Sequence, residues 1–61
     1  MYVIEAGGFY WNGKGFGGFG LAKRYSTYNK AALGVKVAKG FTSASPNISD
    51  WEACYDKEYA A

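Results

Sequence analysis

A chain of 61 residues forms one small domain, whose core is too small for aliphatic burial alone to stabilise it. Its single cysteine, Cys54, excludes an intrachain disulfide, and the lack of histidine excludes the common zinc sites and the usual general base of enzymes at neutral pH. Because 20% of the residues are aromatic and the net charge is only +2, we expect dense aromatic packing or association into a homodimer to supply the missing stability.

The N-terminal third predicts a meander of short strands. Tyr2–Glu5 and Phe9–Trp11 are rich in β-forming residues, and Gly7-Gly8 between them tolerates the positive φ angles of a two-residue hairpin turn. Asn12-Gly13 predicts a second hairpin with a type I′ turn, and a third strand follows over Lys14–Phe16 or somewhat beyond.

Residues 15–20 are interrupted by four glycines, which weaken a strand interior. We expect a twisted strand end that runs into a mobile loop.

Residues 27–39 then predict an α-helix, with Ser26 or Thr27 as the N-cap and Gly40 after its end. Its apolar residues recur with helical spacing: Tyr28, Ala31, Ala32, Val35 and Ala38. Gly34 and the alternation of Leu33, Val35 and Val37 oppose the helix, which we nevertheless predict.

The last segment, Ile48–Ala61, fits two structures. Ser49 and Glu52 match the S-x-x-E capping box of a helix, and Trp51, Cys54, Tyr55 and Tyr59 have helical spacing. Trp51, Ala53 and Tyr55 also alternate with Glu52, Cys54 and Asp56 as a half-exposed strand would, and a small meander gains stability from an added strand. The sequence therefore predicts one α+β domain over residues 1–61. Its core is an antiparallel meander of two or three strands packed by one helix, and its C-terminal segment is either a further strand or a second helix.

Charge is unevenly distributed along the chain. Residues 1–40 hold six basic side chains against the single acid Glu5, a charge of +5, whereas residues 41–61 hold Lys57 against four acids, a charge of −3. Such asymmetry indicates an interaction surface, unless the two halves neutralise each other across the fold. No apolar run approaches the roughly 20 residues of a membrane span, and the N-terminus lacks the basic start of a signal peptide. We expect a cytoplasmic protein with no membrane partner.

The N-terminal motifs resemble a pattern in small bacteriophage-encoded accessory proteins. Those proteins begin with a hairpin of the Y-W-N-G-x-G-W kind, continue with A-K-x-[YF]-x-T and an alanine-rich helix, and often finish on a strand. The matching segments lie within residues 2–38: Tyr2-Val3-Ile4, Phe9-Tyr10-Trp11-Asn12-Gly13-Lys14-Gly15-Phe16, Ala22-Lys23-Arg24-Tyr25-Ser26-Thr27 and Ala31-Ala32. The spacer 17–20 is richer in glycine than the pattern, and the tail after Gly40 has no counterpart in it.

The resemblance implies a phage gene product that acts in the cytoplasm of an infected bacterium. Accessory proteins of this kind with a known activity commonly bind and block a host enzyme or a defence system, for example a nuclease or a CRISPR-type complex. The resemblance transfers no functional residue to this chain.

The residues themselves predict no catalysis, no cofactor and no metal. The acids Asp50, Glu52, Asp56 and Glu58 are typical of a solvated face, and a core this small can hardly enclose a catalytic pocket. Gly13-x-Gly15-x-x-Gly18 formally satisfies the dinucleotide-binding pattern, but no βαβ unit surrounds it.

One constellation of aromatic and basic residues predicts a partner-binding surface. A small sheet cannot bury every ring, so some aromatic surface must remain exposed. Rings beside cations bind single-stranded nucleic acid by stacking and charge, and Trp, Tyr and Arg also dominate protein interfaces. The predicted partner-binding residues are Trp11, Lys14, Phe16, Phe19, Lys23 and Arg24.

We expect the partner to be a host protein or protein complex, which the chain inhibits by steric blocking. The alternatives are a nucleic acid bound by the basic N-terminal two-thirds, and a structural component that self-associates. The modest pI of about 8.8 weighs against the nucleic acid.

Overall fold

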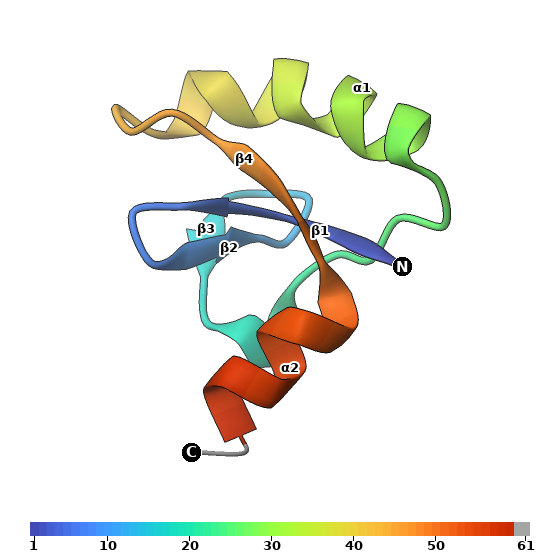
Figure 1. Cartoon of the computed structure of the whole chain (residues 1–61). Helices are drawn as coiled ribbons and strands as arrows, with labels where there is room; N and C mark the ends of the chain where they lie inside the picture. Colours follow the sequence, from blue (N-terminus) through green and yellow to red (C-terminus); the bar gives the residue numbers. More distant parts are fainter. Residues whose placement is uncertain (60–61) are drawn as a thin grey trace.

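The computed structural model describes residues 1–59, and Ala60 and Ala61, the end of the predicted C-terminal segment, lie outside the described residues. A four-stranded antiparallel sheet with the strand order β3-β2-β1-β4 lies between two helices (Figure 1). The strands are β1 (Tyr2–Ala6), β2 (Phe9–Trp11), β3 (Phe16–Gly17) and β4 (Asn47–Asp50), the helices are α1 (Tyr28–Ala38) and α2 (Trp51–Tyr59), and two 3-10 turns are η1 (Phe19–Leu21) and η2 (Lys39–Phe41). The predicted α+β class is confirmed.

The two predicted hairpins differ in how their turns are made. Between β1 and β2, Gly7 and Gly8 both have positive φ, 59° and 87°, as predicted for a tight turn. Between β2 and β3, only the glycine of Asn12-Gly13 has a positive φ. The Asn12 side-chain oxygen instead accepts hydrogen bonds from the backbone N–H groups of Lys14 and Gly15, both at 2.9 Å. The predicted type I′ turn is therefore wrong. A turn closed by the Asn12 side chain takes its place, and the third strand begins at Phe16 and not at Lys14 as predicted.

Helix α1 begins as predicted and packs unusually closely on the sheet. Thr27 is its N-cap, since the side-chain oxygen accepts a hydrogen bond from the Lys30 N–H at 3.2 Å. Small residues face inward, with Ala31 and Ala38 fully buried. Gly34, which opposed the helix in the sequence, lies against Tyr25 and Ile4. The helix tolerates this glycine because its missing side chain is what allows the close approach.

The C-terminal segment contains both a further strand and a second helix, but the residues whose alternation suggested a strand, Trp51 to Asp56, lie in the helix. Residues 47–50 pair with β1 in an antiparallel register that joins Val3 to Ser49 and Tyr2 to Asp50, and α2 begins at the next residue. The Asp50 carboxylate accepts a hydrogen bond from the Ala53 N–H at 3.2 Å. The predicted capping box from Ser49 to Glu52 is therefore wrong. Ser49 is paired with Val3 in the sheet, so Asp50 is the residue that caps the helix.

The hydrophobic core is divided into two halves by the sheet. Successive residues of a strand point to opposite faces, so Val3 and Ile4 lie in different halves, as do Tyr10 and Trp11. The half beneath α1 contains Ile4, Trp11 and Ala38, with Phe16, Tyr25 and Val35 packed against them. The half beneath α2 contains Val3, Tyr10, Phe19 and Cys54, with Ala22 and Trp51 packed against them. The molecule thus has three layers, visible in Figure 1 as α1, the sheet and α2.

The glycine-rich segment 15–20 contains more regular structure than the sequence predicts. The short strand β3 is followed by the turn η1, which buries the Phe19 side chain to 8% exposure. The turn η1 folds back over Tyr10, whose ring centroid lies 5.1 Å from that of Phe19.

Candidate functional site

The extended segment 22–25 distributes its side chains to both faces of the molecule. It is fixed by backbone hydrogen bonds from the Lys23 N–H to the Trp11 carbonyl oxygen at 2.9 Å and between Tyr2 and Tyr25 in both directions at 2.7 and 2.8 Å. Ala22 and Arg24 face the side of α2, whereas Lys23 and Tyr25 face the side of α1. The adjacent cations Lys23 and Arg24 therefore serve two different surfaces.

The structure does not bring the predicted binding residues together on one surface. Trp11 is only 2% exposed and Phe19 only 8%, so the prediction that these rings are exposed is wrong. Both are core residues, because the alternation of β2 turns Trp11 under α1 and η1 folds Phe19 under α2. Phe16 is half-buried against Trp11, with 5.4 Å between ring centroids, and Lys14 is exposed in the turn before β3.

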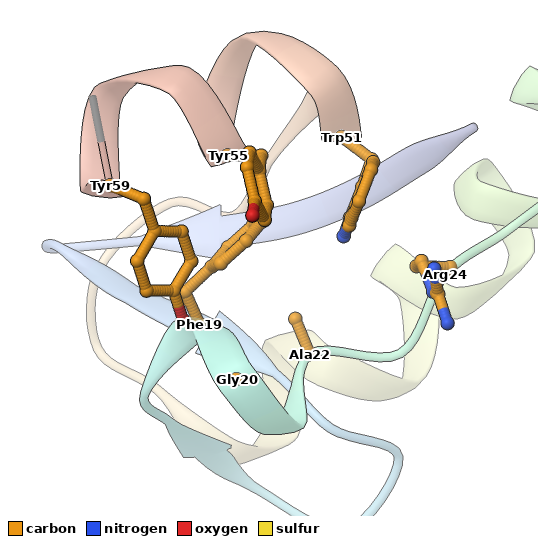
Figure 2. A pocket seen from close by; sticks show the side chains of 7 residues that line it. All are labelled: Phe19, Gly20, Ala22, Arg24, Trp51, Tyr55 and Tyr59. Atoms are coloured by element: carbon orange, nitrogen blue, oxygen red, sulfur yellow. The ribbon is translucent and has the colours of Figure 1, made fainter.

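The first surface is an aromatic groove between α2 and the segment 19–24. It encloses about 370 Å³ and is lined by Phe19, Gly20, Ala22, Arg24, Trp51, Tyr55 and Tyr59. Figure 2 shows the three α2 rings projecting from the helix toward the turn that carries Phe19 and Gly20. The Arg24 guanidinium lies over the Trp51 ring, 5.1 Å from its centroid. This distance is within the range of a cation–π interaction.

The rings of the aromatic groove form a continuous ladder. Trp51, Tyr55 and Tyr59 are spaced by four residues and so lie on one face of α2. Their centroids are 5.2 Å and 4.8 Å apart in succession, and Phe19 lies within 6.3 Å of all three. Each ring limits the rotamers of the next, yet Tyr55 remains 45% exposed and Tyr59 remains 59% exposed.

Sequence reasoning missed Tyr55 and Tyr59 as candidate binding residues. The signal was present in the helical spacing of Trp51, Tyr55 and Tyr59. A strand would also place these three residues on one face, but about 13 Å apart in succession, so only a helix brings their rings into contact.

The second surface, which we call the lysine groove, lies between α1 and the opposite side of the segment 22–25. It encloses about 340 Å³ and is lined by Trp11, Gly13, Lys23, Tyr25, Lys30, Leu33, Gly34 and Val37. Leu33 and Val37 are 62% and 58% exposed, and the Lys23 ammonium lies 5.6 Å from the centre of the Tyr25 ring. The groove is thus lined by exposed aliphatic side chains and lysines together with the buried Trp11 ring and the half-buried Tyr25 ring.

The buried Tyr10 hydroxyl is the polar group with the most unusual environment. It donates a hydrogen bond to the Glu58 carboxylate at 3.3 Å. Burial raises the pKa of Tyr10 above its ordinary value of 10.0, and the neighbouring Cys54 and Glu58 raise it further. A phenol with a raised pKa stays protonated at neutral pH, so this hydroxyl has a structural role and is unsuited to serve as a base.

Within residues 1–59, no three acidic or cysteine side chains gather as a metal site would require. Over the same residues, neither helix combines the length and the apolar character needed to cross a bilayer.

No protein-family model, curated protein sequence or solved structure matches this chain. Its two grooves must therefore be interpreted from their own chemistry.

Proposed function

We propose that this chain is a phage-type accessory protein that binds a macromolecular target and inhibits or modulates it by steric blocking, with the aromatic groove as its contact face. The observation that carries the proposal is the ladder of Trp51, Tyr55 and Tyr59 beside Arg24. Tryptophan, tyrosine and arginine are the residue types that dominate binding energy at protein interfaces.

The geometry of the ladder favours tight binding. Tyr55 and Tyr59 are held against each other and against Phe19, so they lose little rotamer entropy when a partner covers them. Arg24 is likewise positioned by the Trp51 ring, which leaves its guanidinium donors free to bind a carboxylate or carbonyl group of a partner.

The charges around the aromatic groove favour a protein target over a nucleic acid. Glu52, Asp56 and Glu58 are carried by the same helix as the ladder, and Asp50 caps its N-terminus. With Lys57 as the one base, residues 50–59 carry a net charge of −3 (four acids against one base), which repels the phosphate backbone that is the main source of affinity in nucleic-acid binding. The rings would therefore pack against protein side chains.

The resemblance of residues 2–38 to phage accessory proteins supports a target inside a bacterial host. A host nuclease or a CRISPR-type defence complex in the cytoplasm is the target that this resemblance favours. The proposed mode of action needs no catalytic group, because covering an active site or an assembly surface is sufficient to block it.

The test compares two variants that each remove exposed apolar surface, one on each face. Proteins are captured from a bacterial lysate with three tagged proteins: wild type, the double variant Tyr55→Ser/Tyr59→Ser and the control Leu33→Ser. The captured protein is then purified, and its binding to each of the three is measured by calorimetry. We expect the double variant to lose about 100-fold or more in affinity, since two hot-spot rings contribute roughly 2 kcal/mol each, while Leu33→Ser binds as wild type.

The same purified target should lose its activity when saturated with wild type and retain it with the double variant. Circular dichroism of both variants verifies that the fold is intact. Equal target binding by wild type and Tyr55→Ser/Tyr59→Ser would show that the contact lies elsewhere.

A further inference from the structure

We infer that the lysine groove is a second, independent interaction surface, which binds an acidic segment of a partner protein that carries aliphatic side chains. The inference rests on the shape and the charges of the α1 face and does not depend on the function proposed for the aromatic groove.

The groove combines exposed aliphatic side chains with cations at its edges. Leu33 and Val37 are one helical turn apart, and each leaves more than half of its surface exposed. Lys23 borders the groove on the side of the extended segment, and Lys30 borders it on α1. A lone exposed leucine is ordinary on a protein surface, but two neighbouring aliphatic residues in a concave site are a place for a partner's apolar side chains.

Gly34 lines this groove at the point where α1 packs most closely on Tyr25 and Ile4. A Cβ atom at this position would lie 2.5 Å from the Tyr25 hydroxyl oxygen and 2.9 Å from the Ile4 Cδ1 atom. Because the glycine has no side chain, α1 approaches Tyr25 and Ile4 closely. These contacts set the distance between α1 and the Tyr25 side chain, and the groove lies along this junction beside the exposed Leu33 and Val37.

The positive charge of this face is not balanced within its own elements. The sequence from Tyr28 to Phe41 contains Lys30, Lys36 and Lys39 and no acidic residue. Glu5, the only acid before residue 50, accepts a hydrogen bond from the Gly8 N–H in the first hairpin turn. The other acids belong to α2 and its cap, in the layer on the far side of the sheet (Figure 1). An acidic partner would complement this face.

The exposed side chains favour a polypeptide over a single-stranded nucleic acid. Bases bind by stacking on aromatic rings, but the exposed apolar groups of the groove are Leu33 and Val37, which cannot stack. Trp11 lies beneath them and is only 2% exposed. Pairing of two α1 faces from two copies is opposed by their lysines, which would meet across the interface.

The test measures binding of a defined acidic probe by fluorescence anisotropy. The probe is a labelled peptide of about 15 residues, long enough to form a helix, with leucine at positions i, i+3, i+4 and i+7 and glutamate at the others. Two matched probes separate the contributions: one with lysine in place of glutamate, and one with serine in place of leucine. A thymidine oligonucleotide of similar length tests the nucleic-acid alternative.

We expect the leucine–glutamate peptide to bind at least about tenfold more tightly than either matched peptide. Lys23→Glu/Lys30→Glu and Leu33→Ser should each weaken that binding by about tenfold, while Tyr55→Ser/Tyr59→Ser leaves it unchanged. All of these positions are exposed, and circular dichroism verifies that each variant is folded.

Equal binding of the three peptides would overturn the inference, as would wild-type affinity in the Leu33→Ser variant. Tighter binding of the oligonucleotide than of the acidic peptide would assign the groove to nucleic acid instead. Sedimentation as an oligomer that dissociates in Leu33→Ser would show that a second copy of the chain covers the groove, which would also contradict the proposal.

Discussion

The two halves of the core share the strands β1 and β2 but are packed in different ways. Beneath α1, the small residues Ala31, Gly34 and Ala38 bring the helix backbone close to the sheet, and most of the large side chains come from the sheet and from Tyr25 of the extended segment. Beneath α2, only Cys54 of the helix is buried, and rings from η1 and the helix fill the space.

This difference in packing determines what each half leaves exposed. Because α1 packs on the sheet through its small residues, Leu33 and Val37 remain exposed on the face that also carries lysines. Because Cys54 is the buried residue of α2, the rings of Tyr55 and Tyr59 remain exposed beside Arg24 in the aromatic groove. One small sheet thus carries two surfaces of different apolar character, aliphatic with lysines on one face and aromatic with an arginine on the other. Four changes to the core and the helix caps test how separate the two halves are.

The largest expected effect comes from the ring beneath α1. Trp11→Ala should lower the free energy of unfolding by about 3–5 kcal/mol, which is enough to unfold a domain of this size. Phe19→Ala, on the other side, should cost less, because Trp51, Tyr55 and Tyr59 can shift into the space. Urea denaturation followed by far-UV circular dichroism measures both. If the Trp11→Ala variant stayed folded but no longer bound its partner, Trp11 would be a binding residue and not a core residue.

A second change tests the close packing of α1. Alanine normally stabilises a helix by about 1 kcal/mol relative to glycine. At Gly34 the new methyl group would collide with Tyr25 and Ile4, so Gly34→Ala should instead destabilise the protein by about 1–3 kcal/mol. Gly40→Ala is the matched control, since no atom lies within 4 Å of its Cβ position. Thermal unfolding compares the two, and an unchanged or raised midpoint for Gly34→Ala would mean that α1 lies farther from the sheet.

A third change concerns the start of α2. Asp50→Ala should cost about 1 kcal/mol, because the Ala53 N–H loses its acceptor. Asp50→Asn should retain most of this stability, because asparagine is also a favourable N-cap. Ser49→Ala should change the free energy of unfolding little, because Ser49 does not cap α2. Equilibrium denaturation in urea separates the three. A larger loss for Ser49→Ala than for Asp50→Ala would restore the capping box that the sequence predicted.

The smallest effect at neutral pH is expected for Tyr10→Phe. Its hydrogen bond to Glu58 is long, 3.3 Å, so the loss should be at most about 1 kcal/mol at pH 7. The stability difference between wild type and Tyr10→Phe should shrink at alkaline pH. The pKa of Tyr10 is raised in the folded protein, so above pH 10.0 the unfolded chain releases a proton that the folded protein keeps. Wild-type stability should therefore fall as the pH rises above this value.

The control for that titration is the variant itself. Tyr10→Phe should lack this component of the alkaline decrease, so the two stability curves should converge or cross as the pH is raised. Parallel curves from pH 8 to pH 11 would show that the Tyr10 hydroxyl is solvated in the folded protein, and would contradict the division of the core described above.

Much of the architecture follows from local signals in the sequence. The strand alternation in Val3-Ile4 and Tyr10-Trp11 assigns neighbours to opposite faces, and the Thr27 cap and the small residues of α1 place the first helix. The surplus of rings is also confirmed, since Phe9, Tyr28, Phe41, Tyr55 and Tyr59 are all substantially exposed.

The identity of the exposed rings could be decided only by the tertiary structure. The sequence predicted Trp11, Phe16 and Phe19, but burial depends on which segment covers which face, and that is a long-range property. The pairing of β1 with β4 fixes Ser49 and Asp50 in the ladder and starts α2 at Trp51, which aligns the three rings of the aromatic groove.

The sequence by itself determined that this protein is a small α+β domain with more aromatic surface than it can bury. Only the tertiary structure decided that its cations and rings are divided between two faces. The physical reason is that alternation along an extended chain sends neighbouring side chains in opposite directions, as it does for Lys23 and Arg24, while pairing between segments distant in sequence determines what each side chain meets.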